Sequence, residues 1–367
     1  MNKKKVLVGM SGGVDSSVTA LLLKQQGYDV TGLFMRNWDY GIEGSQCPNR
    51  IEFEDAKKVG KLLGIEVKGI DFVEEYRTKV FDVFLEGLKK GLTPNPDILC
   101  NREIKFNVFL NEAKKMGIDT IAMGHYAKVD KINDTYVLGT PKDDTKDQTY
   151  FLHALSSEQL SHAMFPLADL TKKEVREIAK EHNLSVSDKK DSTGICFIGK
   201  QKFDEFITQH LKAIPGDIID DKGKVLGTHK GLICYTIGQR KGIGLGGIVQ
   251  NEAANKSVHN PWYAAYKNVK DNTLTIVQDH DHPLLISKNV EASHMHWVLE
   301  KAPKVGDKLA GQVRYRQQKV ACTVISVNDD KVEVKFDNPQ RAVTLGQSLV
   351  LYDGKYCLGG GFISNYS

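Results

Sequence analysis

The feature that most constrains the fold of this chain is the segment VLVGMSGGVDSS at residues 6–17. An apolar run typical of a buried strand leads into a Ser-Gly-Gly loop, and a helix is predicted to begin near Asp15. Gly12 and Gly13 accept backbone angles that a Cβ forbids, so the loop can curl and direct its N–H groups inward. The helix behind it adds unpaired N–H groups and the positive end of its dipole. Three serines supply hydroxyl donors: Ser11, Ser16 and Ser17. The segment therefore predicts an anion site suited to a pyrophosphate.

The same segment is not a Walker A loop, because no GK[ST] follows the glycines and the usual phosphate-binding lysine is absent. This argues against binding of a γ-phosphate for transfer, as in a kinase. The loop resembles the SGGxDS loop of the pyrophosphatase-type ATP enzymes, which cleave ATP between the α and β phosphates and adenylate a substrate. The alternative is a tight glycine turn. It would account for a lone SGG but explains the strand, SGGVDSS and helix together less well.

Predicted strands and helices alternate along the first half of the chain. Strands are predicted at Lys5–Met10, Val30–Met35, Ile65–Phe72 and Thr120–Gly124, and helices at Asp15–Gln26, Glu52–Leu63, Glu74–Lys90 and Ile104–Met116. A capping box, Thr171 to Glu174, opens a further helix to about His182. This rhythm predicts an α/β fold with a doubly wound parallel sheet. Because ligands bind at the carboxyl ends of such strands, the SGG loop, Met35 and Gly124–His125 are expected to share one crevice.

The pattern changes after about residue 210 to short β-rich runs separated by Gly and Asp turns. These runs are DIID, KVLGTH, ICYTIG, NTLTIV, KLAGQVRY, ACTVISV, KVEVKF and SLVLY. They predict two small β-rich domains, of barrel or sandwich type. We therefore divide the chain into an ATP-binding catalytic domain (1–210), a central β-rich domain (211–280) and a C-terminal β-barrel domain (281–367). Residues 247–260 are small and polar and are predicted to form a long surface loop.

Composition excludes some classes of protein. At 367 residues the chain has room for two or three domains, and 41% hydrophobic with 26% charged residues is typical of a globular protein. No stretch approaches the roughly 18 apolar residues of a membrane span. The apolar run in the basic N-terminus MNKKKVLVGM is too short for a signal peptide, so we expect a cytoplasmic protein without a membrane partner. The net charge of +4 is weak support for a polyanion partner.

Two of the six cysteines stand out by their surroundings. Cys100 lies in GLTPNPDILCNREIKF, where prolines predict an extended loop just before a helix. A helix N-terminus and nearby cations would lower the pKa of its thiol, and Asp97 lies three residues before it. Cys196 lies in the polar loop SDKKDSTGICFIG. No CxxC is present, which argues against a zinc ribbon or a thioredoxin motif, and no metal ligands are predicted. The remaining four are interpreted as structural thiols: Cys47, Cys234, Cys322 and Cys357.

An adenylating loop and two loop cysteines suit one reaction. Adenylation converts a poor leaving oxygen into AMP, and a thiol or persulfide can then displace AMP from the activated carbon. A cysteine pair also lets one sulfur carry a persulfide and the other resolve it as a disulfide. Asp97 could act as a general acid or base, or only cap a turn.

The motif set resembles the tRNA-specific 2-thiouridylase family over nearly the whole chain. SGGVDSS, GLTPNPDILCNREIKF, MGHYA, KDQTYFL, DSTGICFIG and YTIGQRKGIG occur in the order and spacing of that family. The family places sulfur on C2 of the wobble uridine, position 34, of tRNAs for Lys, Glu and Gln. The resemblance implies ATP as cofactor, with Mg²⁺ on its phosphates. It also implies tRNA as partner, and a sulfur-relay protein or a cysteine desulfurase as sulfur donor. We expect the loop at 247–260 to be longer than the usual connection in the family.

The resemblance also implies a role for each matched position. Cys196 would carry the persulfide, and Cys100 would resolve it, with a transient disulfide between the two. The implied ATP contacts are Gly9, Met10, Ser11, Gly12, Gly13, Val14, Asp15, Ser16, Met35 and Gly124. The flipped target base would contact Asn95, Pro96 and Asp97. The implied tRNA contacts are His125, Lys146, Asp147, Gln148, Arg314, Tyr315 and Gln347.

Each of these tRNA contacts has an alternative from the residues alone. His125 could be an ordinary hydrogen-bonded histidine, and residues 146–148 a solvated turn. RYRQQK at 314–319 could contact phosphates and stack a base, or be a solvated strand face. Three rival functions also stay open. One is an adenylating ligase or amidotransferase acting on a metabolite, and another is a non-catalytic RNA-binding protein with structural ATP. The third is an iron–sulfur thiolase with Cys100, Cys196 and Asp97 as candidate cluster ligands.

Overall fold

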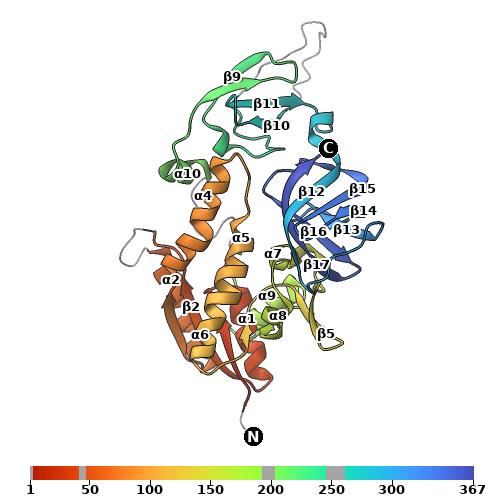
Figure 1. The fold of residues 1–367 in the computed structure, drawn as a ribbon. Helices are drawn as coiled ribbons and strands as arrows, with labels where there is room; N and C mark the ends of the chain where they lie inside the picture. The colour runs from red at the N-terminus through yellow and green to blue at the C-terminus, as the bar shows by residue number, and fades with distance from the viewer. Residues whose placement is uncertain (1–2, 41–46, 192–202, 245–260) are drawn as a thin grey trace.

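A five-stranded parallel sheet forms the centre of the N-terminal half (Figure 1). The computed structural model describes residues 3–40, 47–191, 203–244 and 261–367. The sheet has the order β3-β2-β1-β4-β7, and all its pairings are parallel. Its strands are β1 (Lys5–Gly9), β2 (Asp29–Arg36), β3 (Val67–Asp71), β4 (Ile121–Ala122) and β7 (Ala163–Met164). The predicted α/β fold with a doubly wound sheet is confirmed.

Helices cover both faces of this sheet because β1 is apolar on both sides. Successive side chains of a strand point to opposite faces. Leu7 therefore packs into one core, which includes Phe84 and Phe109, while Val6 and Val8 pack into another. The helices are α1 (Val14–Gln25), α2 (Pro48–Leu63), α3 (Val73–Tyr76), α4 (Asp82–Lys89), α5 (Pro96–Leu99), α6 (Phe109–Lys115), α7 (Thr149–Leu152), α8 (Ser157–Ser161), α9 (Lys172–Glu181) and α10 (Phe203–His210).

Two of these helices are extended by wider π-helical turns. Residues Arg77–Phe81 join α3 to α4, and residues Cys100–Val108 join α5 to α6. The second helix therefore runs from Pro96 to Lys115 without a break. The predicted start at Ile104 is wrong, because Asn95 caps the helix and Pro96 occupies its first turn. The capping box at Thr171 is confirmed, since its side chain accepts from the Glu174 N–H and the Glu174 side chain from that of Thr171.

A small four-stranded sheet follows, with the order β10-β11-β8-β9. Its strands are β8 (Gly216–Ile219), β9 (Val225–His229), β10 (Trp262–Asn268) and β11 (Thr273–Gln278). The predicted run ICYTIG is not a strand, because its start forms a short 3₁₀ turn at Leu232–Cys234. The predicted surface loop at 247–260 lies wholly outside the described residues, so the structure does not test this prediction.

The C-terminal region is a closed six-stranded barrel that recruits a hairpin from the first half. The barrel strands are β12 (Ile286–Trp297), β13 (Lys308–Gln312), β14 (Val320–Val327), β15 (Lys331–Arg341), β16 (Ser348–Asp353) and β17 (Tyr356–Tyr366). Pairing of β12 with both β15 and β17 closes the barrel. The hairpin β5 (Lys128–Ile132) and β6 (Thr135–Gly139) extends the sheet, with Gly139 opposite Tyr356. The predicted β-rich C-terminal region is confirmed.

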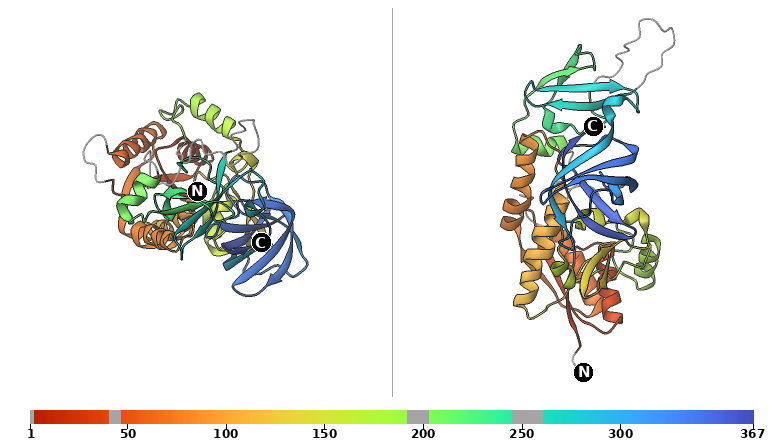
Figure 2. Two further views of the ribbon diagram at one scale, coloured as in Figure 1. Left: turned by 90° about the horizontal axis from the view of Figure 1, so that it is seen from above. Right: turned by 45° about the vertical axis from the view of Figure 1, so that its right-hand side comes forward.

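The three parts meet at one place. Figures 1 and 2 show the small sheet at one end of the molecule, beside the barrel and above the ends of α4 and α5. The loop between α4 and α5 bonds to the barrel, since the Thr93 N–H donates to the Leu345 carbonyl at 2.8 Å. It also bonds to the small sheet through Lys267. Within the described ranges, no helix is both long and apolar enough to cross a membrane.

Candidate active site

The SGG loop is shaped by close backbone packing. Gly12 has φ +70°, and a Cβ there would collide with the backbone carbonyl oxygen of Glu52 on α2. Gly13 is the N-cap of α1 and has no side-chain cap. The first N–H groups of α1 therefore keep the unpaired end that suits an anion. The predicted loop, with glycines required for its path, is present at the carboxyl end of β1.

The three serines of the loop differ from expectation in their availability. The hydroxyls of Ser16 and Ser17 donate to the Gly13 carbonyl at 3.2 and 2.7 Å, and both residues are buried. The backbone N–H of Ser11 donates to the Ser16 hydroxyl at 3.2 Å. The exposed hydroxyl of Ser11 accepts the Gly13 N–H at 3.3 Å. Of the three predicted hydroxyl donors, Ser11 is thus the one that faces solvent, since the others satisfy the helix start.

The ends of strands β1, β2 and β4 lie close together. A Cβ on Gly9 would lie 2.6 Å from Met123 Sδ and 3.7 Å from Met35 Cε, so β1, β2 and β4 converge there. A Cβ on Gly124 would lie 2.9 Å from the carbonyl carbon of Asp15 and from the N of Ser16. Gly124 therefore lies against the first turn of α1. The implied ATP residues from Gly9 to Ser16 therefore lie close to Met35 and Gly124.

An ion network holds the first turn of α1. Lys172 Nζ lies 2.7 Å from Asp15 Oδ1 and 2.7 Å from Asp191 Oδ1, and the Tyr126 hydroxyl donates to Asp15 at 3.0 Å. Asp191 also binds Lys146 at 2.9 Å and Arg176 at 2.8 Å. Burial raises the pKa of Asp191, but hydrogen bonds from Lys172 and Lys146 outweigh it and lower that pKa to about 2. The carboxylate is therefore ionised at neutral pH.

Sequence reasoning missed four members of this network: Tyr126, Lys172, Arg176 and Asp191. Lys172 follows the Thr171 cap, and that cap was the available signal. A lysine in the first turn of a helix interacts unfavourably with the helix dipole, so its presence there indicates an ion pair with another part of the chain. Lys189 holds the SGG loop from its other side. Its Nζ donates to the Gly12 carbonyl at 2.9 Å and pairs with Asp55 at 3.1 Å, which ties the loop to α2.

Cys100 is inside a helix and buried, which contradicts the prediction of an activated loop thiol. It is 2% exposed, and burial raises its pKa to about 11, despite a small lowering by Lys105. Asn95 Oδ1 accepts the Asp97 N–H at 3.1 Å, so Asn95, Pro96 and Asp97 build the first turn of this helix. Cys196 lies outside the described residues, so its distance from Cys100 is not defined. Each cysteine that the structure describes, Cys100 included, is free.

The implied tRNA contacts on the first domain have internal partners. His125 is buried between the rings of Phe106 and Phe165, and burial holds its pKa well below the usual range. Its Nδ1 has no partner, so it is not the ordinary hydrogen-bonded histidine considered above. Gln148 Oε1 accepts the Tyr126 N–H at 2.9 Å. Asp147 accepts from Thr149 at the start of α7 and binds Lys319. Lys146 is partly exposed beside Asp191.

The implied contacts from the barrel lie close to the Cys100 helix. The ring of Tyr315 lies 4.2 Å from that of Phe151, whose carbonyl accepts from Asn101 at 3.1 Å. Gln347 Nε2 donates to the Thr93 carbonyl at 2.6 Å, two residues before Asn95. Arg314 and Tyr315 lie in the turn after β13 and not on a strand face. The structure thus brings residues from the two ends of the chain to one side of the Cys100 helix.

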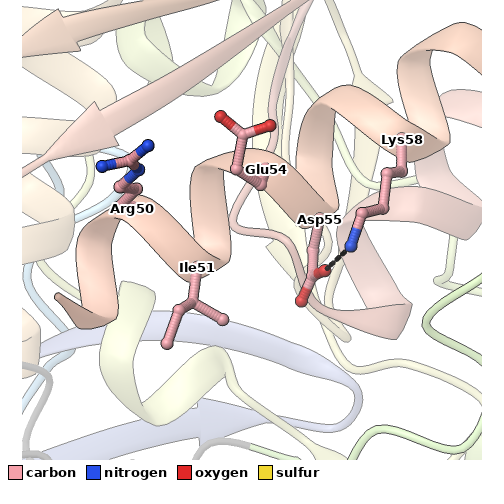
Figure 3. Close-up of a pocket in the computed structure, with 5 residues that line it drawn as sticks. All are labelled: Arg50, Ile51, Glu54, Asp55 and Lys58. Carbon is pink, nitrogen blue, oxygen red and sulfur yellow. Dashed lines mark hydrogen bonds and ion pairs between the residues drawn. The ribbon is translucent and has the colours of Figure 1, made fainter. Parts of the chain in front are cut away.

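A separate shallow hollow of about 210 Å³ lies on α2 (Figure 3). It is lined by Arg50, Ile51, Glu54, Asp55 and Lys58. None of the residues assigned to ATP, base or tRNA lines it. Across the described ranges, no group of three or more His, Cys, Asp or Glu side chains is arranged to hold a metal ion.

Three protein-family models match the chain in succession. The tRNA methyl transferase HUP domain matches residues 4–200, the tRNA methyl transferase PRC-barrel domain 204–278, and the aminomethyltransferase beta-barrel domain 287–363. Over its full length the chain is 80% identical to tRNA-specific 2-thiouridylase MnmA 2 of Aliarcobacter butzleri (strain RM4018), and covers 100% of that protein. The chain belongs to the tRNA-specific 2-thiouridylase family.

More distant members of the thiouridylase family match over the same span. The chain is 50% identical over 364 residues to tRNA-specific 2-thiouridylase MnmA of Francisella philomiragia, covering 99% of this chain and 100% of that one. It is 49% identical over 364 residues to the MnmA of Ralstonia pickettii (strain 12J), covering 99% and 97%. The family resemblance inferred from the motifs is confirmed, and the HUP domain of this thiouridylase carries the SGG loop.

Proposed function

We propose that this protein carries out the ATP-dependent 2-thiolation of the wobble uridine, position 34, in tRNAs for Lys, Glu and Gln. As a member of the thiouridylase family, the chain is a sulfurtransferase that acts on tRNA uridine. One observation carries the finer proposal. Lys172 joins Asp15 of the SGG loop to Asp191, which precedes Cys196 by five residues in the sequence. The segment that leads to the proposed sulfur carrier is therefore anchored at the proposed ATP site.

The first proposed step is adenylation of uridine O2. The open N-terminus of α1 and the Ser11 hydroxyl would bind the ATP phosphates, and Gly124 would let the nucleotide approach the loop closely. Uridine O2 attacks the α-phosphorus, an O–P bond forms, and pyrophosphate leaves. The absence of a Walker lysine supports cleavage at this bond rather than γ-phosphoryl transfer. Mg²⁺ bound to the phosphates would neutralise part of the leaving charge.

The second proposed step replaces oxygen by sulfur. Cys196 carries a persulfide, and sulfur adds to uridine C2 while AMP leaves with the former O2. Either the terminal persulfide sulfur attacks C2 and Cys100 then attacks the other sulfur, or Cys100 first releases hydrosulfide. In both routes a Cys100–Cys196 disulfide remains, and an external thiol must reduce it. A sulfur-relay protein or a cysteine desulfurase would reload Cys196. Asp97, on the first turn of the Cys100 helix, would act as general acid or base.

The buried state of Cys100 makes the reaction conditional on a rearrangement. With a pKa of about 11, the Cys100 thiol is protonated at neutral pH and has no solvent access. Docking of tRNA would have to open the contacts around the first turn of the Cys100 helix, where Asn95 to Asp97 would receive the flipped base. Base flipping costs a few kcal/mol, and least for an anticodon base that is already unpaired. This ordering would keep the nucleophile protonated until the substrate is present.

The proposal assigns parts of the reaction to parts of the chain. ATP chemistry would belong to residues 1–210, while 211–280 and 281–367 would add tRNA contacts through Arg314, Tyr315 and Gln347. His125, Asp147 and Gln148 are engaged internally, so we propose that they position the tRNA surface around Lys146. A tRNA substrate also implies that the enzyme works in the cytoplasm.

A thiolation assay tests this proposal. Unmodified tRNA for Lys would be incubated with the enzyme, MgATP, cysteine and a desulfurase, and then run on a mercury-containing gel that retards thiolated tRNA. We expect a retarded band that requires ATP and is lost in both Cys196→Ser and Cys100→Ser. Cys47→Ser, which removes a partly exposed free cysteine outside the proposed site, is the matched control. Full activity of Cys196→Ser would overturn the sulfur relay.

A further inference from the structure

Three cations line residues 235–238, which end in a turn at Ile237 and Gly238 where the small sheet meets the barrel. Lys267 Nζ donates to the Tyr235 carbonyl at 3.2 Å, and Arg314 donates to the Ile237 carbonyl at 3.4 Å. Gly238 lies between two guanidinium groups. A Cβ there would be 3.5 Å from the NH1 nitrogen of Arg341 and 3.9 Å from that of Arg314. The cations come from β10, from the turn after β13 and from the end of β15, so the fold gathers them from distant parts of the sequence.

Within the described parts of the chain, no carboxylate compensates these charges. Among the residues that the structure describes, none of the three cations forms an ion pair, whereas cations at the SGG loop are paired with Asp15, Asp55 or Asp191. Burial lowers the pKa of Lys267 to about 8. Burial also lowers the pKa of Arg314, and the nearby charge of Arg341 lowers it further. Partly buried like charges without counterions destabilise a protein until an anion joins them.

Arg341 is held in place through its Nε, while one of its terminal nitrogens has no acceptor among the described residues. Its Nε donates to the His280 carbonyl at 2.7 Å, and its guanidinium carbon lies 4.9 Å from the centre of the Tyr263 ring. One terminal nitrogen is buried with no partner, and the other points to Gly238. A guanidinium fixed by its inner nitrogen and by an aromatic ring is preorganised to bind an oxyanion.

Lys267 links these cations to the loop that leads to the proposed base site. Lys267 Nζ is also 3.4 Å from the hydroxyl of Thr93, whose carbonyl accepts from Gln347. Asn95, the first residue proposed to contact the base, follows two residues later. Cations spread along a segment suit a chain of separated anions better than one small ion. An RNA backbone supplies such anions, and phosphates dominate the affinity of proteins for RNA.

We propose that Lys267, Arg314 and Arg341 form a binding site for the backbone phosphates next to the target uridine. Lys267 and Arg341 are thereby added to the contacts implied for Arg314. The site rests on the proposed function, because it takes the tRNA of that reaction as its ligand. Neutralising the three cations with phosphates would fix the barrel, the small sheet and the loop between α4 and α5 relative to one another when tRNA is bound.

Salt-dependent tRNA binding tests this site in the full-length enzyme. The dissociation constant for unmodified tRNA for Lys would be measured from 50 to 300 mM KCl, without ATP. Lys267→Gln and Arg341→Gln should each weaken binding roughly 3–10-fold and reduce the slope of log K against log salt by about 0.7–1. Lys270→Gln and Lys335→Gln are matched controls, because they remove exposed charges from the same hairpin and from β15. Lys267→Arg and Arg341→Lys should keep the wild-type slope.

The outcomes separate this site from the proposed reaction. If the wild-type enzyme thiolates tRNA while both Gln variants keep its slope and affinity, the phosphate site is wrong and the proposed function stands. If the variants lose affinity for the desulfurase but not for tRNA, these three cations bind an acidic protein and the RNA proposal is wrong. Thermal unfolding identifies a variant that fails to fold. If Lys267→Gln fails to fold, Lys267→Met, which has an uncharged side chain of similar length, is measured in its place. The salt slope of its tRNA binding then tests the phosphate site in the same way.

Discussion

The Nζ atom of Lys172 lies 2.7 Å from Oδ1 and 2.8 Å from Oδ2 of Asp15, on the first turn of α1. The lysine side chain is 11% exposed, so its partner carboxylate has little competition from water. Replacement by Met would leave Asp15 and Asp191 as neighbouring carboxylates without their shared cation. We expect Lys172→Met to lower the free energy of unfolding by about 1–3 kcal/mol and to weaken ATP binding. Thermal unfolding and ATP titration measure both.

The adjacent Lys173 is the matched control for this prediction. It is 86% exposed, and its ion pair with Glu177 is 3.8 Å long, so Lys173→Met should change neither quantity measurably. Equal effects of the two substitutions would contradict a specific role for the Lys172 network.

Asp191 gives the network a predictable acid dependence. Its pKa of about 2 in the folded protein lies below the ordinary value of 3.8, so its contribution to stability is present above about pH 4. That contribution is lost as the pH falls from about 4 to 2. A third of the side chain is exposed, so we expect about 1–2 kcal/mol rather than the full linkage energy. The stability difference between wild type and Asp191→Asn should therefore shrink as the pH falls over this range. If urea unfolding gave the same difference in unfolding free energy between the two proteins from pH 5 to pH 2.5, the predicted contribution of the Asp191 carboxylate would be wrong.

Gly124 should tolerate no side chain. A Cβ would lie 2.9 Å from backbone atoms of Asp15 and Ser16, and backbone cannot move aside as a flexible side chain can. Gly124→Ala should push α1 from β4 and reduce ATP affinity by about tenfold or more, which corresponds to about 1.4 kcal/mol. Gly139→Ala is the control, because its Cβ would meet no atom closer than 3.5 Å. Isothermal titration with an ATP analogue distinguishes the two, and unchanged affinity in Gly124→Ala would remove this glycine from the site.

Cys100 should react slowly in the free enzyme. With a pKa of about 11, only about one thiol in a thousand is ionised at pH 8, and the side chain is buried. Iodoacetamide should therefore modify the partly exposed Cys47 at least roughly tenfold faster, as peptide mass spectrometry would show. Bound tRNA and an ATP analogue should increase the rate at Cys100. If Cys100 is the first cysteine modified in the free enzyme, its thiol is already accessible, and the proposed opening of the Cys100 helix by tRNA is wrong.

Lys267 predicts that tRNA binding depends on pH. Its pKa of about 8 lies below the ordinary value of 10.5, so a protonated Lys267 costs stability below pH 8, and that cost disappears as the pH rises toward 10.5. The groups that face it are the Thr93 hydroxyl and the Tyr235 carbonyl, with no carboxylate among the described residues. A bound phosphate would restore the proton, so affinity should fall from pH 7 to pH 9. Lys267→Arg should lose this dependence, and equal pH profiles at fixed ionic strength would contradict it.

The parts of the fold that could be predicted are those encoded locally. The SGG loop follows from its glycines, and the α/β alternation follows from the buried strand β1 and the helices that flank it. The pairing of β6 with β17 joins residues more than 200 positions apart, and no local pattern reports it. The surroundings of Cys100 could not be predicted for a different reason. The prolines before Cys100 predict an extended loop, but an Asn-Pro pair can equally be the cap and first residue of a helix, as it is here.

The central claim is that uridine O2 is adenylated and then replaced by sulfur. An anticodon stem-loop of tRNA for Lys that carries ¹⁸O at O2 of uridine 34 tests it directly. After a single round of thiolation with MgATP and a persulfide-loaded enzyme, mass spectrometry would measure the label in AMP. We predict one ¹⁸O atom in AMP for each 2-thiouridine formed. Thiolated RNA with unlabelled AMP would contradict the claim, because O2 would then have left by a route that does not pass through the adenylate.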